Sequence, residues 1–174
     1  MIKTERDLWK LLKKSSAGIL FDRIENWALP GIPDLLGYNQ NKIFFTLELK
    51  VIKGNKIRFS PHQVAWHLRH GPGAFILVAR SPKPISNIVS HNLLDTRYSM
   101  RGLARGRAHP KKNQGSGFVG GLRAGGPTHF FLYKSSQIMD LVSRGIKTGP
   151  IVGGLRINEI IKYISGLGAK APSP

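Results

Sequence analysis

The stretch GIPDLLGYNQNKIFFTLELK, residues 31–50, determines how the chain is expected to fold. Residues 34–38 and 42–52 both have the pattern of β-strands, and the turn-prone Asn39-Gln40-Asn41 between them favours a hairpin. Successive side chains of a strand point to opposite faces. In the second strand, one face therefore carries Ile43, Phe45, Leu47 and Leu49, and the other carries Phe44, Thr46, Glu48 and Lys50.

Two carboxylates in this stretch are unexpected, because the chain has 27 Lys and Arg residues and only 9 Asp and Glu residues. The alternation places Glu48 and Lys50 on one face, and the hairpin brings Asp34 across from them. A protein that only held nucleic acid would gain nothing from negative charge there. Two plainer interpretations stay open. Asp34 could cap the turn after Pro33, or Glu48 and Lys50 could form an exposed ion pair of little energetic value.

The composition limits the class of protein. A chain of 174 residues with 41% hydrophobic residues suits one domain with a real core. The formal net charge of +18 favours a polyanionic partner, above all nucleic acid. There is no cysteine, no apolar run approaching the roughly 18 residues of a spanning helix, and no signal-peptide pattern at the N-terminus. We therefore expect a cytoplasmic protein that is not secreted and does not bind a membrane.

The rest of the chain is expected to mix helices and strands around one sheet. The spacing predicts helices over residues 4–14, from Ser60 to Gly71, over 135–144 and over 156–167, and strands over 19–24, 73–80 and 128–134. This order predicts an α/β fold with a central mixed sheet flanked by helices. One domain would span residues 1–167, and residues 168–174 would form a flexible tail.

A basic insertion is expected at about residues 91–127. From Thr96 to Pro127 there is no acidic residue and there are eight glycines, a composition typical of a loop that binds nucleic acid or of a solubilising linker. Arginine outnumbers lysine here, which favours the binding interpretation, because the arginine guanidinium can bind phosphate through two N–H groups and can stack on bases. The candidate nucleic-acid contacts are Arg97, Arg101, Arg105, Arg107, Lys111, Lys112 and Arg123, with Lys53, Lys56 and Arg58 after the second hairpin strand.

Histidines and tryptophans suggest no separate site. His67 and His70 are spaced i, i+3, but without carboxylate or cysteine partners such a pair is more often at the surface or facing phosphate than binding a metal. Trp9 and Trp66 are expected in the core.

Three stretches together carry a resemblance to a known superfamily. They are GIPDLL, then LELK, then SPHQVAWHLRHGPGAFILV, in which a Gly-x-Pro-Asp turn, an apolar strand with Glu-x-Lys, and a helix beginning with Gln63 follow one another. This order resembles the PD-(D/E)xK nucleases, in particular the VRR-NUC branch and the Holliday-junction resolvases. The resemblance covers roughly residues 1–80, with a weaker echo at 128–145.

The resemblance implies a restriction-endonuclease-like core and a metal-dependent endonuclease that cuts DNA, branched DNA in particular. Such an enzyme would serve recombination, repair or replication in a bacterial or virus-infected cell, and would act as a homodimer. Its ion would be Mg²⁺, with Mn²⁺ able to substitute. Two rivals stay open: a basic protein that binds or packages nucleic acid without cutting it, and an RNA-binding protein of ribosomal type.

The chemistry assigns a role to each candidate residue. Asp34 and Glu48 would hold the ion together with the main-chain carbonyl of Leu49, since a hard cation takes oxygen ligands. Lys50 would position or polarise the attacking water, or neutralise the transition state. By resemblance, Glu5 would complete the site or hold a second ion, and Gln63 would orient water or phosphate. Their plainer interpretations are a helix-dipole partner for Glu5 and a solvated helix residue for Gln63.

Overall fold

The structure is a computed structural model that describes residues 2–16, 18–24, 30–82 and 126–169. The chain divides into two units, residues 1–83 with 126–174 and residues 84–125. The second unit lies outside the described residues. This includes most of the predicted insertion and all seven of its candidate basic contacts, Arg97, Arg101, Arg105, Arg107, Lys111, Lys112 and Arg123.

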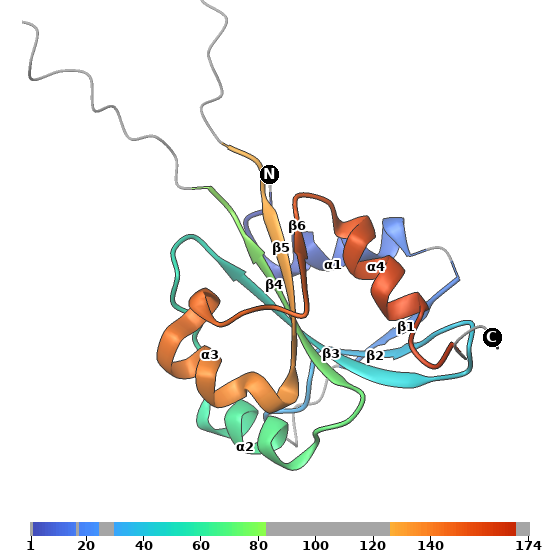
Figure 1. The fold of residues 1–174 in the computed structure, drawn as a ribbon, viewed down its shortest axis with the longest axis horizontal. Coiled ribbons are helices and arrows are strands. Elements are labelled where there is room, and N and C mark those ends of the chain that lie inside the picture. Colours follow the sequence, from blue (N-terminus) through green and yellow to red (C-terminus); the bar gives the residue numbers. More distant parts are fainter. Residues whose placement is uncertain (1, 17, 25–29, 83–125, 170–174) are drawn as a thin grey trace, which may run out of the picture. The chain divides into compact units, whose positions relative to one another are not determined.

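A six-stranded mixed sheet forms the centre of the first unit (Figure 1). Its strands lie side by side in chain order, and every neighbouring pair is antiparallel except β3 and β4, which are parallel. A parallel pair needs a crossover connection, and α2 provides it. The strands are β1 (Leu20–Arg23), β2 (Leu35–Tyr38), β3 (Phe44–Ile52), β4 (Ala74–Arg80), β5 (His129–Lys134) and β6 (Val152–Gly154).

Helices cover both faces of the sheet, which confirms the predicted α/β architecture (Figure 1). On one face lie α1 (Glu5–Ser15) and α4 (Ile157–Ser165); on the other lie α2 (Pro61–Arg69) and α3 (Ile138–Arg144). Short 3₁₀ turns, η1 (Ser135–Gln137) and η2 (Gly145–Lys147), flank α3. None of the helices in the described part of the chain is both long and apolar enough to cross a bilayer.

The helix starts follow the sequence closely. Thr4 caps α1 and exchanges hydrogen bonds with Asp7, and Ser60 does the same with Gln63 at the start of α2, where Pro61 takes the first helical position. Two details differ from expectation. The helix after β5 begins as the 3₁₀ turn η1, and the short strand β6 was not predicted, because two of its three residues are glycines.

Two apolar clusters, one on each face of the sheet, make up the core. The larger cluster joins α1 and α4 to the sheet and includes Phe45, Leu47 and Leu49 of β3. The smaller one joins α2 and α3 to the other face. Trp9 packs at the edge of the larger cluster, as expected. Trp66 does not belong to either cluster: it is partly exposed on α2, stacked on His70 with 4.1 Å between ring centroids.

The turn between β2 and β3 is fixed to the end of α4 by one buried side chain. Asn39 is 2% exposed, and its Nδ2 donates to the main-chain carbonyls of Ile164 and Leu167, both at 2.9 Å. Its Oδ1 accepts from the main-chain N–H groups of Asn41 and Ile43, both at 3.0 Å. The hairpin that carries the candidate site is thereby held in place relative to the helix that closes the chain.

Replacing Asn39 by Ala should therefore destabilise the protein strongly. The change removes four hydrogen bonds made by a buried side chain, which should lower the free energy of unfolding by about 3 kcal/mol. Urea unfolding followed by circular dichroism would measure it. Asn41→Ala is the control: it also removes two hydrogen bonds to α4, but from an exposed side chain, and should cost less than about 1 kcal/mol. Equal losses in the two variants would contradict the assignment.

Candidate active site

The site begins where the ladder between β2 and β3 ends. Leu35 pairs with Leu47 in antiparallel register, and continuing that register places Asp34 opposite Glu48 and Pro33 opposite Leu49. Proline has no N–H to donate, so the ladder cannot extend past it. The main-chain N–H of Leu49 donates instead to Oδ2 of Asp34 at 2.7 Å. Asp34 is thus fixed by the strand that carries Glu48, and it does not simply cap the turn after Pro33.

A glycine lets the same loop touch α2. Gly31 has a φ of +94°, and a Cβ there would lie 2.5 Å from the main-chain carbonyl of His62. Both the conformation and the space favour glycine. The Gly-x-Pro-Asp turn therefore lies directly against the first turn of α2, and this contact brings Asp34 and Gln63 to the same place.

The carboxylate of Glu48 lies inside the protein. Glu48 is 0% exposed, and its Oε1 lies 2.7 Å from Nζ of Lys50 and also accepts a hydrogen bond from Nε2 of Gln63. Its Oε2 is buried and has no hydrogen-bond partner. The interpretation of Glu48 and Lys50 as an exposed ion pair is therefore wrong. A buried, half-satisfied carboxylate is costly, and in native proteins such a group needs a specific explanation.

Lys50 connects Glu48 to the first helix. Its side chain is 13% exposed, and its Nζ lies 3.8 Å from Oε1 of Glu5. The ammonium also lies 5.6 Å from the centre of the Phe59 ring, which flanks it on the side of α2. Glu5 is half exposed in the first turn of α1. It is therefore more than a helix-dipole partner, because its carboxylate faces the same ammonium as Glu48.

Gln63 uses both ends of its amide. Its Oε1 accepts from the main-chain N–H of Ser60 at 3.0 Å, as part of the α2 cap, and its Nε2 donates to Glu48. An amide held at one end by the helix start has a fixed direction at the other. Gln63 is thus not a freely solvated residue, and in this structure it orients Glu48. The predicted role toward water or phosphate stays a prediction.

Burial and neighbouring charge shift the proton equilibria of the site. Burial, and next the charge of Asp34, raise the pKa of Glu48 to about 7, although Lys50 acts in the opposite direction. Burial also raises the pKa of Glu5, where Lys50 acts in the opposite direction and Asp34 adds to the rise. The carboxylates of Asp34, Glu48 and Glu5 therefore influence one another, and Lys50 compensates only part of their charge.

A small hollow of about 30 Å³ opens beside these groups. Glu5 and Asp34 line it, together with Leu49 and with Arg23 of β1. The N–H and C=O of one strand residue point toward the same neighbouring strand, so the carbonyl of Leu49 faces the side on which Asp34 lies. Arg23 and Phe59 were missed by the sequence reasoning, because neither belongs to a motif: only the register of β1 and the loop before α2 bring them here.

The donor set suits a hard cation. Asp34 and Glu48 offer carboxylate oxygens, Leu49 offers a carbonyl, and Oε2 of Glu48 is buried without a partner. Within the described ranges, no three His, Cys, Asp or Glu side chains are spaced to form a metal site by themselves. An ion at this place would therefore take main-chain oxygen or water as further ligands, which Mg²⁺ accepts readily. The residues present fit such an ion.

His67 differs from expectation. It is 1% exposed rather than at the surface, because its position on α2 points toward η1 and the sheet. Its Nδ1 lies 2.5 Å from Oγ of Ser135, and its Nε2 is buried without a partner. Burial, and next the charge of Lys50, lower the pKa of His67 to about 4. The sequence of α2 did not predict that His67 points inward, because apolar and polar residues do not follow a regular helical spacing there.

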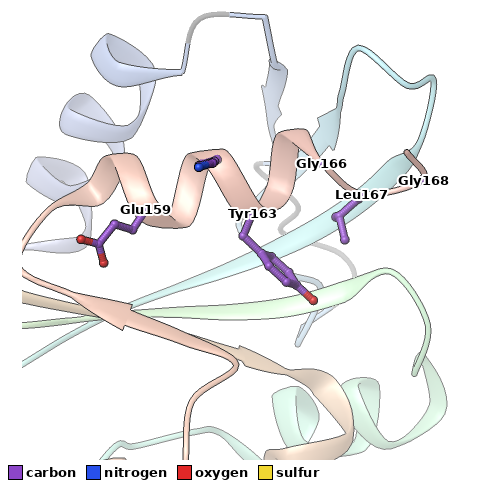
Figure 2. A pocket seen from close by; sticks show the side chains of 6 residues that line it. Glu159, Tyr163, Gly166, Leu167 and Gly168 are labelled. Carbon is purple, nitrogen blue, oxygen red and sulfur yellow. The ribbon is translucent and has the colours of Figure 1, made fainter. Parts of the chain in front are cut away.

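Of the candidate basic contacts, the structure describes the three that follow β3. Lys53, Lys56 and Arg58 are exposed in the loop that leads from β3 to α2. This loop begins after Ile52, close in sequence to Lys50. A separate hollow of about 570 Å³ runs along α4. In Figure 2, Glu159 and Tyr163 point to the same side of that helix. None of the candidate site residues lines this hollow.

Comparison of the sequence with models of known protein families finds no match, and no curated protein matches it either. The function of the site therefore has to follow from its own geometry and chemistry.

The raised pKa of Glu48 predicts a pH-dependent contribution to stability in buffer without divalent cations. Because the folded pKa of about 7 exceeds the ordinary 4.5, the folded protein binds more protons than the unfolded chain between these values. The contribution of Glu48 should therefore fall by about 3 kcal/mol as the pH rises from 4.5 to 7. His67, with a lowered pKa, contributes with the opposite sign.

The measurement is the free energy of unfolding of the wild type and of Glu48→Gln between pH 4.5 and 8. The wild type should lose its advantage over the variant as the pH rises, because the variant lacks the titrating group. The control is Asp22→Asn, which removes an exposed carboxylate of β1 and should follow the wild type in parallel. A Glu48→Gln curve that also ran parallel to the wild type would rule out the proposed burial cost.

Proposed function

We propose that this protein is a metal-dependent endonuclease that hydrolyses phosphodiester bonds in DNA, with a PD-(D/E)xK site on a restriction-endonuclease-like core. One observation carries the proposal. Asp34, Glu48 and Lys50 meet at one end of the β2–β3 hairpin, with Gln63 and Glu5 beside them, and Glu48 is buried with one oxygen unpaired. The hairpin, α1 and α2 thus contribute side chains to one site.

Each residue has a part that its contacts support. Asp34 and Glu48 are directed by a main-chain N–H and by the Gln63 amide, so they offer oxygen ligands in fixed positions. A bound Mg²⁺, or Mn²⁺ in its place, would stabilise negative charge on the phosphate and lower the pKa of a bound water. Lys50 lies within reach of the same place, where its ammonium would neutralise charge on the phosphate as the bond is cleaved.

The cost of the arrangement supports a catalytic purpose. Burying Glu48 raises its pKa and leaves Oε2 unpaired, which destabilises the folded chain. A protein that only bound or packaged nucleic acid would gain no affinity from three carboxylates facing the phosphate. Strongly shifted carboxylates beside a lysine are typical of sites that perform chemistry.

The preference for branched DNA, the homodimer and a role in recombination, repair or replication all come from the resemblance to junction resolvases. The positive charge of the whole chain, which includes residues 97–123, supports DNA as the substrate.

The test is cleavage of labelled four-way junction, flap, single-stranded and duplex DNA in the presence of Mg²⁺. Asp34→Asn and Glu48→Gln should each lower the rate by more than about 100-fold, because they remove oxygen ligands. Lys50→Met should lower it by about 100-fold, because it removes positive charge at the phosphate. Binding of DNA by Asp34→Asn and Glu48→Gln should equal or exceed that of the wild type, since each change removes negative charge.

Asp22→Asn provides the matched control. It removes an exposed carboxylate one strand away and should leave the cleavage rate unchanged. Absence of Mg²⁺-dependent cleavage on all four substrates, together with firm binding, would instead support the non-catalytic binding protein. Tighter binding to structured RNA than to any DNA would favour the RNA-binding alternative.

A further inference from the structure

A basic groove lies between two segments far apart in the sequence, one of which belongs to the loop that leads to Phe59. One wall is residues 55–58, in the loop between β3 and α2; the other is residues 142–145 with Lys147, at the end of α3 and in η2. Its volume is about 570 Å³, in the range of small-ligand sites. Sequence reasoning assigned Lys56 and Arg58 to DNA, and it assigned nothing on the second wall.

The two walls are joined by main-chain contacts. The N–H of Ile146 donates to the carbonyl of Asn55 at 3.0 Å. Gly145 has a φ of +60°, and a Cβ there would lie 2.0 Å from that same carbonyl oxygen, so only glycine permits the approach. Ile57 and Leu141 anchor the walls in the smaller apolar cluster. The groove is therefore a built feature of the fold and not a chance gap between loops.

The charge of the groove is one-sided. Lys56, Arg58, Arg144 and Lys147 are all exposed, and no carboxylate is among the groove-lining residues that the structure describes. Arg144 is compensated in part, because its Nη2 lies 2.8 Å from Oδ1 of Asp140 on the same helix. Cations gathered in one hollow repel each other, and a polyanion relieves that repulsion.

The chemistry of the lining selects phosphates rather than bases. No aromatic side chain is found along the described walls, so the groove offers no surface on which a base could stack. Lysine and arginine side chains on opposite walls suit the oxygens of a sugar–phosphate backbone, which carry no sequence information.

The groove is also within reach of the DNA that the active site would hold. Lys56 follows Lys50 by six positions, so the two lie at most about 20 Å apart at ~3.3 Å per residue. The same loop ends at Phe59, which lies beside the Lys50 ammonium. Along one strand of a duplex, phosphates advance by about 3.4 Å, so the groove corresponds to phosphates within about six nucleotides of the cleaved bond.

We propose that the basic groove binds backbone phosphates of the DNA substrate a few nucleotides from the cleaved bond. The proposal rests on the proposed nuclease function and adds the path of the DNA: from the active site along the loop between β3 and α2 to the end of α3.

The experiment measures the affinity of the full chain for fluorescein-labelled duplex and four-way junction DNA by anisotropy, at several salt concentrations. EDTA prevents cleavage. Lys56→Gln/Lys147→Gln removes one charge from each wall. Its control, Lys13→Gln/Lys162→Gln, removes the same charge from exposed positions on α1 and α4, on the opposite face of the sheet. Circular dichroism checks that both variants fold.

The groove variant should bind duplex at least about tenfold more weakly near physiological salt, and its dependence of log affinity on log salt should flatten by roughly 0.9 for each lost contact. The control should change neither quantity beyond the general effect of net charge. Equal changes in the two variants would overturn the proposal. Because no cleavage is measured, a groove effect would stand even if the protein proved unable to cut DNA.

Discussion

The burial of the Glu48 carboxylate between β3 and α2 is the constraint on which the site depends. An ionised carboxylate inside a protein is tolerated only with close partners, and here they are Lys50 on the same strand and Gln63 at the start of α2. Asp34, opposite in the register, adds a like charge and raises the pKa of Glu48. The partners are supplied by elements that would not otherwise need to meet. The geometry of the hairpin, the Gly31 contact and the capped α2 all bring them together.

The two faces of the sheet differ in what they bury. The face under α1 and α4 holds the larger apolar cluster, which includes Leu49 but none of the charged side chains of the site. The other face combines a smaller apolar cluster with buried polar atoms that lack partners, among them Oε2 of Glu48, Nε2 of His67 and the hydroxyl of Tyr133. A protein selected only for stability would not concentrate such costs on one face. The basic groove opens on this same side.

Much of the fold and of the site could be predicted from local pattern, and the rest depended on contacts between distant segments. The alternation of apolar and polar residues in β3 predicted which side chains share a face, and Ser60-Pro61 predicted the start of α2. Alternation could not show that Glu48 on the polar face of β3 is buried, because its burial depends on the contact with α2. For the same reason His67 was placed at the surface, and the wall at residues 142–147 carried no signal of its own. The two glycines of β6 gave no local sign of a strand, because this strand depends on its pairing with β5.

The most direct test of the central claim is calorimetric titration of the metal-free protein with Mn²⁺. The account predicts one saturable binding event in the wild type that disappears in Asp34→Asn and in Glu48→Gln, while both variants remain folded, and that persists in Asp22→Asn. Mn²⁺ binding of the same strength in the wild type and in both site variants would contradict the claim that Asp34 and Glu48 are arranged around a cation.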